Sequence, residues 1–252
     1  MDARAGGIHQ TESHANSHSG SELRDITTAT DKPGTADKPD SLSRQIYARL
    51  REDIIRGKYP EGSRLAEQPI AEDLEVSRVP LREAVPLLEM DGFVRTFPRR
   101  GAVVFQWNKK AVDDLFDLRL TIEVGAARYA ARQVAEGKSI VQLNDALAHS
   151  QRVVLHQDSY EIAQSSTWYH EAIVDTAGNE LMSQLMRTIS GRMMWLFFLT
   201  SQLDVEDAFE DHVTLRDAIA SGNERVAESI AYAHIERDRV PSFIALRERG
   251  EF

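Results

Sequence analysis

The sequence contains no cysteine among its 252 residues. This absence excludes disulfide bonds, thiolate metal sites and a cysteine nucleophile, and it agrees with a reducing compartment. The sequence also lacks an apolar run approaching the roughly 18 residues that cross a membrane, and residues 1–40 contain no apolar segment typical of a signal peptide. We therefore expect a cytoplasmic protein that has no membrane partner.

Positive charge is scarce in the chain as a whole. The formal net charge is −10 at pH 7, which at first argues against a nucleic-acid partner. However, residues 41–106 carry 11 Lys+Arg against 10 Asp+Glu, whereas residues 107–252 carry 15 against 23. Because the acidity lies mostly in the C-terminal part, the middle segment can present a local basic face.

Composition and periodicity divide the chain into three segments. Residues 1–40 are rich in Ser, Thr, Gly, Asp and His, so we expect a disordered tail whose three histidines are solvated: His9, His14 and His18. Residues 41–106 show three helical patterns and then two short β-type runs, "FVRTF" and "AVVFQW". This order predicts a winged helix-turn-helix.

Residues 107–252 contain only amphipathic helical patterns. We expect an antiparallel α-helical bundle, with Pro241 kinking its last helix. The fold class is therefore mainly α, a winged helix-turn-helix followed by a bundle. The predicted bundle helices lie near residues 109–136, 139–156, 159–177, 180–200, 203–220 and 223–249.

The stretch "VSRVPLREAV", residues 76–85, begins the third helix. Ser77 is a good N-cap residue, and Arg78 and Arg82 lie on one face because they are four residues apart. Two guanidinium groups there suit phosphate oxygens or guanine edges in a major groove. The alternative is a solvated face on which Arg82 pairs with a nearby acid such as Glu83 or Glu89.

Pro86 does not fit the interior of that helix. A proline removes one backbone hydrogen bond and clashes with the preceding turn, which costs roughly 3 kcal/mol. We therefore expect a kink or an early loss of regularity after Arg82, while the arginine face survives.

Three histidines, His170, His212 and His234, lie on apolar stripes of separate predicted helices. Converging neutral imidazoles form a good site for a divalent metal. The alternative is three core histidines bonded to backbone or water. Arg119 lies on the inward stripe of the first bundle helix, where it can clamp a carboxylate or pair with Glu123 four residues later.

These segments resemble a known family. Residues 46–104, "IYARLREDIIRGKYPEGSRLAEQPIAEDLEVSRVPLREAVPLLEMDGFVRTFPRRGAVV", are similar to the DNA-binding domain of GntR-type bacterial transcription regulators. The segments "LFDLRLTIEVGAARYAA", "WYHEAIVDTAGN" and "DHVTLRDAIASGNERVAESIAYAH" are similar to the FCD effector domain of the FadR branch. The resemblance implies a homodimer that binds a palindromic operator in double-stranded DNA. It also implies release or re-orientation by a small metabolite, often a carboxylate, and we expect a repressor.

The resemblance also implies the DNA contacts. The family's contacts fall on residues in the third helix and at the wing tip: Ser77, Arg78, Arg82 and Gly101. Arg99 and Arg100 flank the tip and suit minor-groove or phosphate contacts. Gln68 stands where many relatives have arginine, so that contact is weaker or differently specific. Glu75 replaces the usual turn glycine, which predicts a less relaxed corner.

The family's metal site includes an aspartate one turn before the first histidine, and here that position is Ser166. A hydroxyl is a poor ligand beside a carboxylate. We expect a weakened Zn²⁺, Ni²⁺ or Mn²⁺ site on His170, His212 and His234, with the effector's carboxylate in the vacant place beside Ser166. The resemblance implies that Arg119 contacts the effector. The competing hypothesis is a metal-free pocket whose histidines bond the effector directly.

The sequence therefore predicts a ligand-responsive transcription regulator. DNA reading is expected in residues 41–106, and effector binding and dimerisation in residues 107–252. The alternative from another class is a metal-dependent enzyme that uses the three histidines. A third interpretation, a helical scaffold, predicts no salt-dependent DNA affinity.

Overall fold

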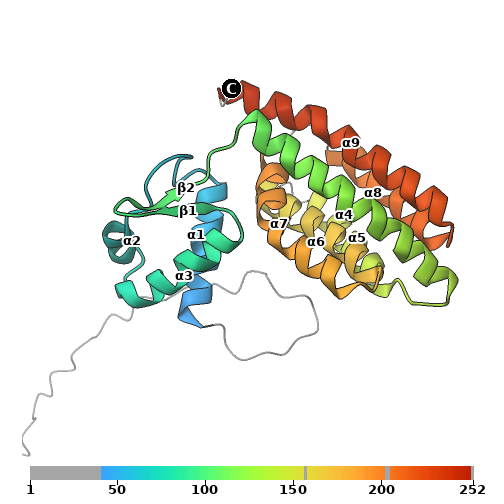
Figure 1. Cartoon of the computed structure of the whole chain (residues 1–252), viewed down its shortest axis with the longest axis horizontal. Coiled ribbons are helices and arrows are strands. Elements are labelled where there is room, and N and C mark those ends of the chain that lie inside the picture. The colour runs from blue at the N-terminus through green and yellow to red at the C-terminus, as the bar shows by residue number, and fades with distance from the viewer. Residues whose placement is uncertain (1–40, 156–157, 202–204, 251–252) are drawn as a thin grey trace, which may run out of the picture. The chain divides into compact units, whose positions relative to one another are not determined.

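The computed structural model describes residues 41–155, 158–201 and 205–250 (Figure 1). Over these residues the fold has nine helices and one two-stranded antiparallel sheet, which confirms the predicted fold class. The predicted disordered tail and its histidines, His9, His14 and His18, lie outside the described residues. No helix in the described part is both long and apolar enough to cross a membrane.

The segment after residue 40 folds in the predicted order. It contains α1 (Leu42–Ile55), α2 (Glu67–Asp73), α3 (Arg78–Met90), β1 (Val94–Phe97) and β2 (Gly101–Val104). The apolar positions of α1 recur at helical spacing, and Ile46, Leu50 and Ile54 are buried. This face packs against α3. The two strands pair antiparallel, with Val94 opposite Val104, and form the wing.

The third helix begins where the sequence predicts but differs in two details. Ser77 occupies the N-cap position, yet its side chain makes no capping hydrogen bond. The helix then continues through Pro86 to Met90, so the predicted loss of regularity after Arg82 is wrong. Pro86 is exposed, and the carbonyl that its missing N–H leaves unpaired can bond to water instead.

Two residues other than glycine adopt left-handed backbone conformations within the described residues. Glu75 has a φ of 53° in the turn between α2 and α3, as its replacement of a turn glycine predicts. Arg99 has a φ of 65° at the wing tip, where Arg100 N donates to Phe97 O at 3.2 Å and closes the turn. With Pro98 before it, Arg99 occupies a position that usually takes glycine.

The remaining helices form the bundle (Figure 1). They are α4 (Lys109–Ala135), α5 (Val141–Val154), α6 (Ser159–Thr176), α7 (Glu180–Thr200), α8 (Val205–Ala220) and α9 (Glu224–Glu248). All six agree with the predicted helices to within two residues at each end, and α9 continues through Pro241. Helix α4 packs along α9 and α6, and α6 also packs against α5 and α7.

Side-chain caps set the starts of two helices that carry predicted site residues. Asp158 accepts hydrogen bonds from the first turn of α6, and Asn223 accepts them from the first turn of α9. Asp and Asn are favoured at these positions because their side-chain oxygens pair with otherwise unbonded N–H groups. The caps thereby fix the helical phase that turns His170 and His234 inward.

Candidate functional site

Helix α3 exposes both predicted arginines, and one carboxylate binds them both. The Arg82 Nε atom donates to Glu67 Oε2 at 2.8 Å, and Arg78 Nη2 donates to the same oxygen at 3.3 Å. Arg82 therefore pairs with an acid, as the alternative expects, but the acid is Glu67 and not Glu83 or Glu89. Glu89 instead accepts a bond from the backbone of β1, because the wing folds back onto the end of α3.

The Glu67 carboxyl is held in its ionised form by these contacts. Its hydrogen bond from Arg82, together with that from Arg78, lowers the pKa of Glu67. The side chain of Glu67 is 36 % exposed, whereas those of Arg78 and Arg82 are 50 % and 59 % exposed. Ion pairs at such exposure contribute about 0–1 kcal/mol to stability, so the fold does not depend on this cluster.

The other predicted DNA contacts also lie on the surface. Arg99 and Arg100 are exposed at the wing tip, and Gly101 begins β2. Gln68 is exposed at the start of α2, where its amide donates to Glu72 at 2.6 Å. Arg64 was not among the residues singled out from the sequence. It is exposed beside the wing tip, and its guanidinium lies 3.7 Å from the position that a Cβ of Gly101 would take.

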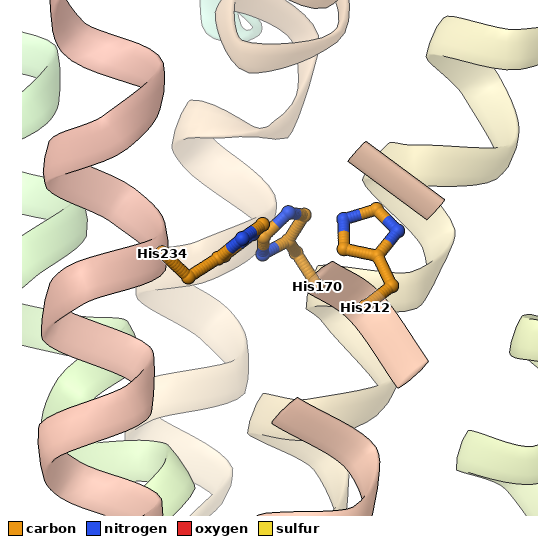
Figure 2. Close-up of side chains that lie close together, drawn as sticks. All are labelled: His170, His212 and His234. Carbon is orange, nitrogen blue, oxygen red and sulfur yellow. The ribbon is translucent and has the colours of Figure 1, made fainter. Parts of the chain in front are cut away.

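The three predicted histidines meet inside the bundle (Figure 2). His170 lies on α6, His212 on α8 and His234 on α9, and each side chain is buried. One nitrogen from each ring can be chosen so that all three lie within 4.8 Å of one another. A tetrahedral zinc would need roughly 3.4 Å between such atoms, so the rings would move slightly inward around a metal.

Two of the imidazoles have a carboxylate near their Nδ1 atoms. His170 Nδ1 lies 2.6 Å from Glu123 Oε2, and His234 Nδ1 lies 4.0 Å from Asp211 Oδ2. Within the described residues, the Nε2 atoms of both histidines have no hydrogen-bond partner. A metal-binding histidine commonly donates its other ring N–H to a carboxylate. The separation at His170 fits this arrangement, whereas the 4.0 Å at His234 is beyond hydrogen-bond distance, so the residues present fit a divalent cation with one of the two carboxylates in place.

Burial determines the protonation state of two of these rings. It lowers the pKa of His170, despite the opposing effect of the Glu123 carboxylate, and it lowers the pKa of His212 well below the ordinary value. Both imidazoles are therefore neutral near pH 7. Neutral imidazole is the form that can bind a metal or accept a hydrogen bond.

Arg119 lies fully buried on α4 and makes the predicted pair with Glu123. Its Nε donates to Glu123 Oε1 at 2.8 Å, and Nη1 lies 3.7 Å from Asp238 Oδ2. Burial raises the pKa of Glu123, but Arg119 and then His170 outweigh burial and lower it to about 2. Within the described part of the chain, Nη1 and Nη2 of Arg119 have no hydrogen-bond partner. The pairing with Glu123 therefore leaves these two nitrogens without a hydrogen bond, although Arg119 is not among the described residues that line the cavity beside the histidines.

A cavity of about 80 Å³ adjoins the histidine cluster. A cavity needs roughly 10–15 Å³ of such space to hold one water molecule, so this cavity fits about five to eight non-hydrogen atoms. Its walls include the three histidines, Phe197 and Asp238. Five serine and threonine residues also line it, Ser150, Ser165, Ser166, Thr200 and Ser201, and the hydroxyls of all but Ser166 already take part in hydrogen bonds within the protein.

The fixed charges around the cavity are negative in sum. Arg119 is balanced by Glu123, and Asp211 bonds to Arg237. Asp238 remains, since among the described residues its ion pair is with the same Arg119. A carboxylate ligand would therefore meet a net charge of about −1 unless a cation bound beside it.

Three carboxylates of these two sites were not singled out from the sequence: Glu67, Asp211 and Asp238. Two of them had a local signal. Asp238 follows His234 by one turn of α9, and Asp211 directly precedes His212. Glu67 had none, because its arginine partners are 11 and 15 residues away on another helix.

Comparison with known proteins matches both parts of the chain. Residues 42–104 match the profile described as bacterial regulatory proteins, gntR family, and residues 114–237 match the profile of the FCD domain. The first match covers α1 to β2, and the second covers the histidine cluster.

Similar proteins are known from several bacteria. The chain is 26 % identical to the galactonate operon transcriptional repressor of Escherichia coli (strain K12), over 76 % of this chain and 92 % of that one. It is 24 % identical to the gluconate operon transcriptional repressor of Bacillus licheniformis, over 69 % and 70 %. The structure of a transcriptional regulator GntR from Rhodococcus sp. RHA1 superposes with a TM-score of 0.66 at 21 % identity, over 81 % of this chain and 98 % of that chain.

Proposed function

The chain belongs to the GntR family of bacterial regulatory proteins and carries an FCD domain, and from this premise we propose that it is a homodimeric repressor released by a small carboxylate. The family and the relatives are transcriptional regulators, so the chain is a DNA-binding regulator, and the enzyme alternative is wrong. The proposal rests on one observation above all. Three buried imidazoles converge beside a cavity in the domain that accompanies the DNA-binding segment.

For DNA reading, we propose that Arg78 and Arg82 enter the major groove. Both guanidinium groups are exposed on α3, and an arginine fork matches the O6 and N7 acceptors of guanine. The Ser77 hydroxyl makes no capping bond, which leaves it available to a phosphate oxygen. A second contact through Gln68 requires its amide to leave Glu72.

The wing supplies the second set of DNA contacts in this proposal. Arg99 and Arg100 suit phosphates or the minor groove beside the recognition helix. Arg99 holds a left-handed conformation that ordinarily favours glycine, and such outliers gather at functional positions. Gly101 then keeps the tip narrow enough to approach the DNA backbone.

For the effector site, the charges favour a metal-assisted pocket over the metal-free alternative. His170, His212 and His234 would hold Zn²⁺, Ni²⁺ or Mn²⁺, and the bound cation would supply the positive charge that a carboxylate needs next to Asp238. Arg119 would orient that carboxylate through Nη1 and Nη2, which requires Nη1 to turn from Asp238, 3.7 Å away, toward the cavity. Because Ser166 stands where the family's aspartate is expected, the metal would be held weakly.

The cavity favours a compact, hydroxylated acid. Its volume suits about five to eight non-hydrogen atoms, and the five hydroxyls in its walls can bond to those of a ligand. Two relatives are named for the gluconate and galactonate operons, and gluconate and galactonate are both six-carbon sugar acids. We infer a smaller hydroxy acid of three or four carbons for this chain.

Effector binding would act on the operator complex through a population shift. A ligand changes a conformational equilibrium only when it binds the two states with different affinity. In the proposed homodimer, the effector would favour an arrangement of the two winged helices that does not match the operator half-sites.

Metal analysis of protein purified without a His tag tests the metal-assisted pocket. In equilibrium dialysis against an excess of Zn²⁺, Ni²⁺ or Mn²⁺, we expect about one metal per chain, and His212→Ala should lose it. Ser166→Asp should tighten binding at least about tenfold, because it adds a carboxylate ligand. Absence of bound metal from both the natural protein and Ser166→Asp would support the metal-free pocket instead.

A ligand screen tests the effector itself. Three- and four-carbon hydroxy acids are compared with gluconate and galactonate, with and without metal, by thermal unfolding and then by release of bound DNA. We expect the compact acids to raise the melting temperature and to weaken operator binding, and Arg119→Ala to lose this response. If only the six-carbon acids act, the inferred size class is wrong.

A further inference from the structure

One carboxylate links the two arginines of the recognition helix. Glu67 is the first residue of α2, and its Oε2 atom accepts from Arg82 Nε at 2.8 Å and from Arg78 Nη2 at 3.3 Å. These contacts join α2 to α3 across the turn that contains Glu75. Since both arginines use the same oxygen, the position of either guanidinium constrains the other.

The geometry leaves specific donors for another partner. Arg82 is held through Nε, which leaves Nη1 and Nη2, the two terminal nitrogens of the fork. Arg78 donates one N–H of Nη2 to Glu67, which leaves the second N–H of Nη2 to form a two-donor fork with a neighbouring nitrogen. Each arginine therefore retains four of its five N–H donors, enough for a bidentate contact with one guanine.

A simpler role for Glu67 would be to stabilise α2. An acidic residue in the first turn interacts favourably with the helix dipole, and exposed ion pairs contribute little. However, a carboxylate between two DNA-contacting arginines also repels phosphates and reduces the affinity for any DNA sequence. Helix stabilisation alone could be obtained from an acid that contacts neither arginine.

We propose that Glu67 is a positioning residue for operator selectivity. It orients Arg78 and Arg82 so that both present paired donors to base edges, and its negative charge weakens binding to DNA of unrelated sequence. The proposal rests on the proposed role of these arginines in reading the operator. It requires that the Glu67 contacts persist when DNA is bound.

Glu67→Gln removes the charge but preserves the size of the side chain. Dissociation constants are measured for an operator duplex chosen by selection from random DNA and for an unrelated duplex of equal length, at several salt concentrations. We expect the variant to bind the unrelated duplex more tightly and the operator no more tightly. The ratio of the two affinities should fall by about tenfold.

Glu83→Gln is the matched control. Glu83 is exposed on α3 beside Arg82, and within the described residues no hydrogen bond or ion pair joins it to Arg78 or Arg82. Its neutralisation should tighten binding to both duplexes alike and leave their ratio unchanged. Melting temperatures of both variants, compared with the natural protein, report whether α2 is still folded.

Two results would overturn the positioning role. In the first, Glu67→Gln changes the two affinities in parallel, as Glu83→Gln does. In the second, selectivity is lost only at one C·G pair, which would mean that Glu67 itself accepts from the cytosine amino group. Arg78→Ala tests the proposed function by itself. If this variant bound the operator normally, the arginines would not read DNA, and the proposed function would fail independently of the role of Glu67.

Discussion

Replacing Arg78 with alanine is expected to abolish sequence-selective DNA binding while leaving the protein folded. A bidentate arginine–guanine contact contributes roughly 1–3 kcal/mol of discrimination. A homodimer loses two such contacts, so operator affinity should fall by roughly 2–6 kcal/mol. Because Arg78 is half exposed and its ion pair is weak, the free energy of unfolding should change little.

Titration of operator and unrelated duplexes over a range of salt concentrations measures this effect. Arg225→Ala is the matched control, since Arg225 has a side chain 92 % exposed on α9 and lies outside the winged helix. The control should bind both duplexes as the natural protein does. Natural operator affinity in Arg78→Ala would exclude α3 as the reading element.

Replacing Glu123 with alanine is expected to cause the largest loss of stability among the variants considered. The substitution leaves Arg119 fully buried with Asp238 as its only remaining described carboxylate, at 3.7 Å. Removing one partner of a buried ion pair commonly costs about 3–5 kcal/mol. His170 also loses the carboxylate next to its Nδ1, so the affinity of the proposed metal site should fall as well.

Urea unfolding of the metal-free protein measures this loss. Glu180→Ala, at a carboxylate that is 75 % exposed on α7, is the control and should change the unfolding free energy by less than about 0.5 kcal/mol. If Glu123→Ala does not fold, the double variant Arg119→Met, Glu123→Leu provides the test. It should fold, because apolar side chains of similar volume can replace a buried ion pair. If Glu123→Ala lowers the free energy of unfolding by less than about 1 kcal/mol, the ion pair between Arg119 and Glu123 is accessible to water.

The helical spacing of apolar residues was sufficient to predict most of the helices. The bundle helices follow from apolar spacing and from polar residues at their starts, such as Asp158 and Asn223, because both signals are local. Pro86 shows the limit of local reasoning. Its intrinsic cost is real, but the buried contacts of Leu81 and Leu88 on the opposite face hold α3 together, and helix packing commonly overrides propensity.

The candidate sites were predictable to different degrees. The pairing of Arg119 with Glu123 follows from their spacing on one helix, and the three histidines were placed inward by their apolar neighbours. In contrast, the approach of Asp238 to Arg119 depends on how α9 packs against α4. The bond from Arg82 to Glu67 likewise depends on the angle between α2 and α3, which no residue pattern specifies.

The measurement that most directly tests the account is selection of DNA from a random pool by the full chain. The selected site is then titrated with salt. We expect the pool to converge on a short palindrome, because a homodimer presents two equivalent recognition helices. The logarithm of its affinity should fall linearly with the logarithm of salt concentration.

A pool without any enriched sequence, or binding to all DNA alike, would contradict the central claim that this chain reads an operator. An enriched site without two-fold symmetry would still support DNA reading by α3, but it would contradict the proposed homodimer. Enrichment of a palindrome by the natural protein and its loss in Arg78→Ala is the result that the account predicts.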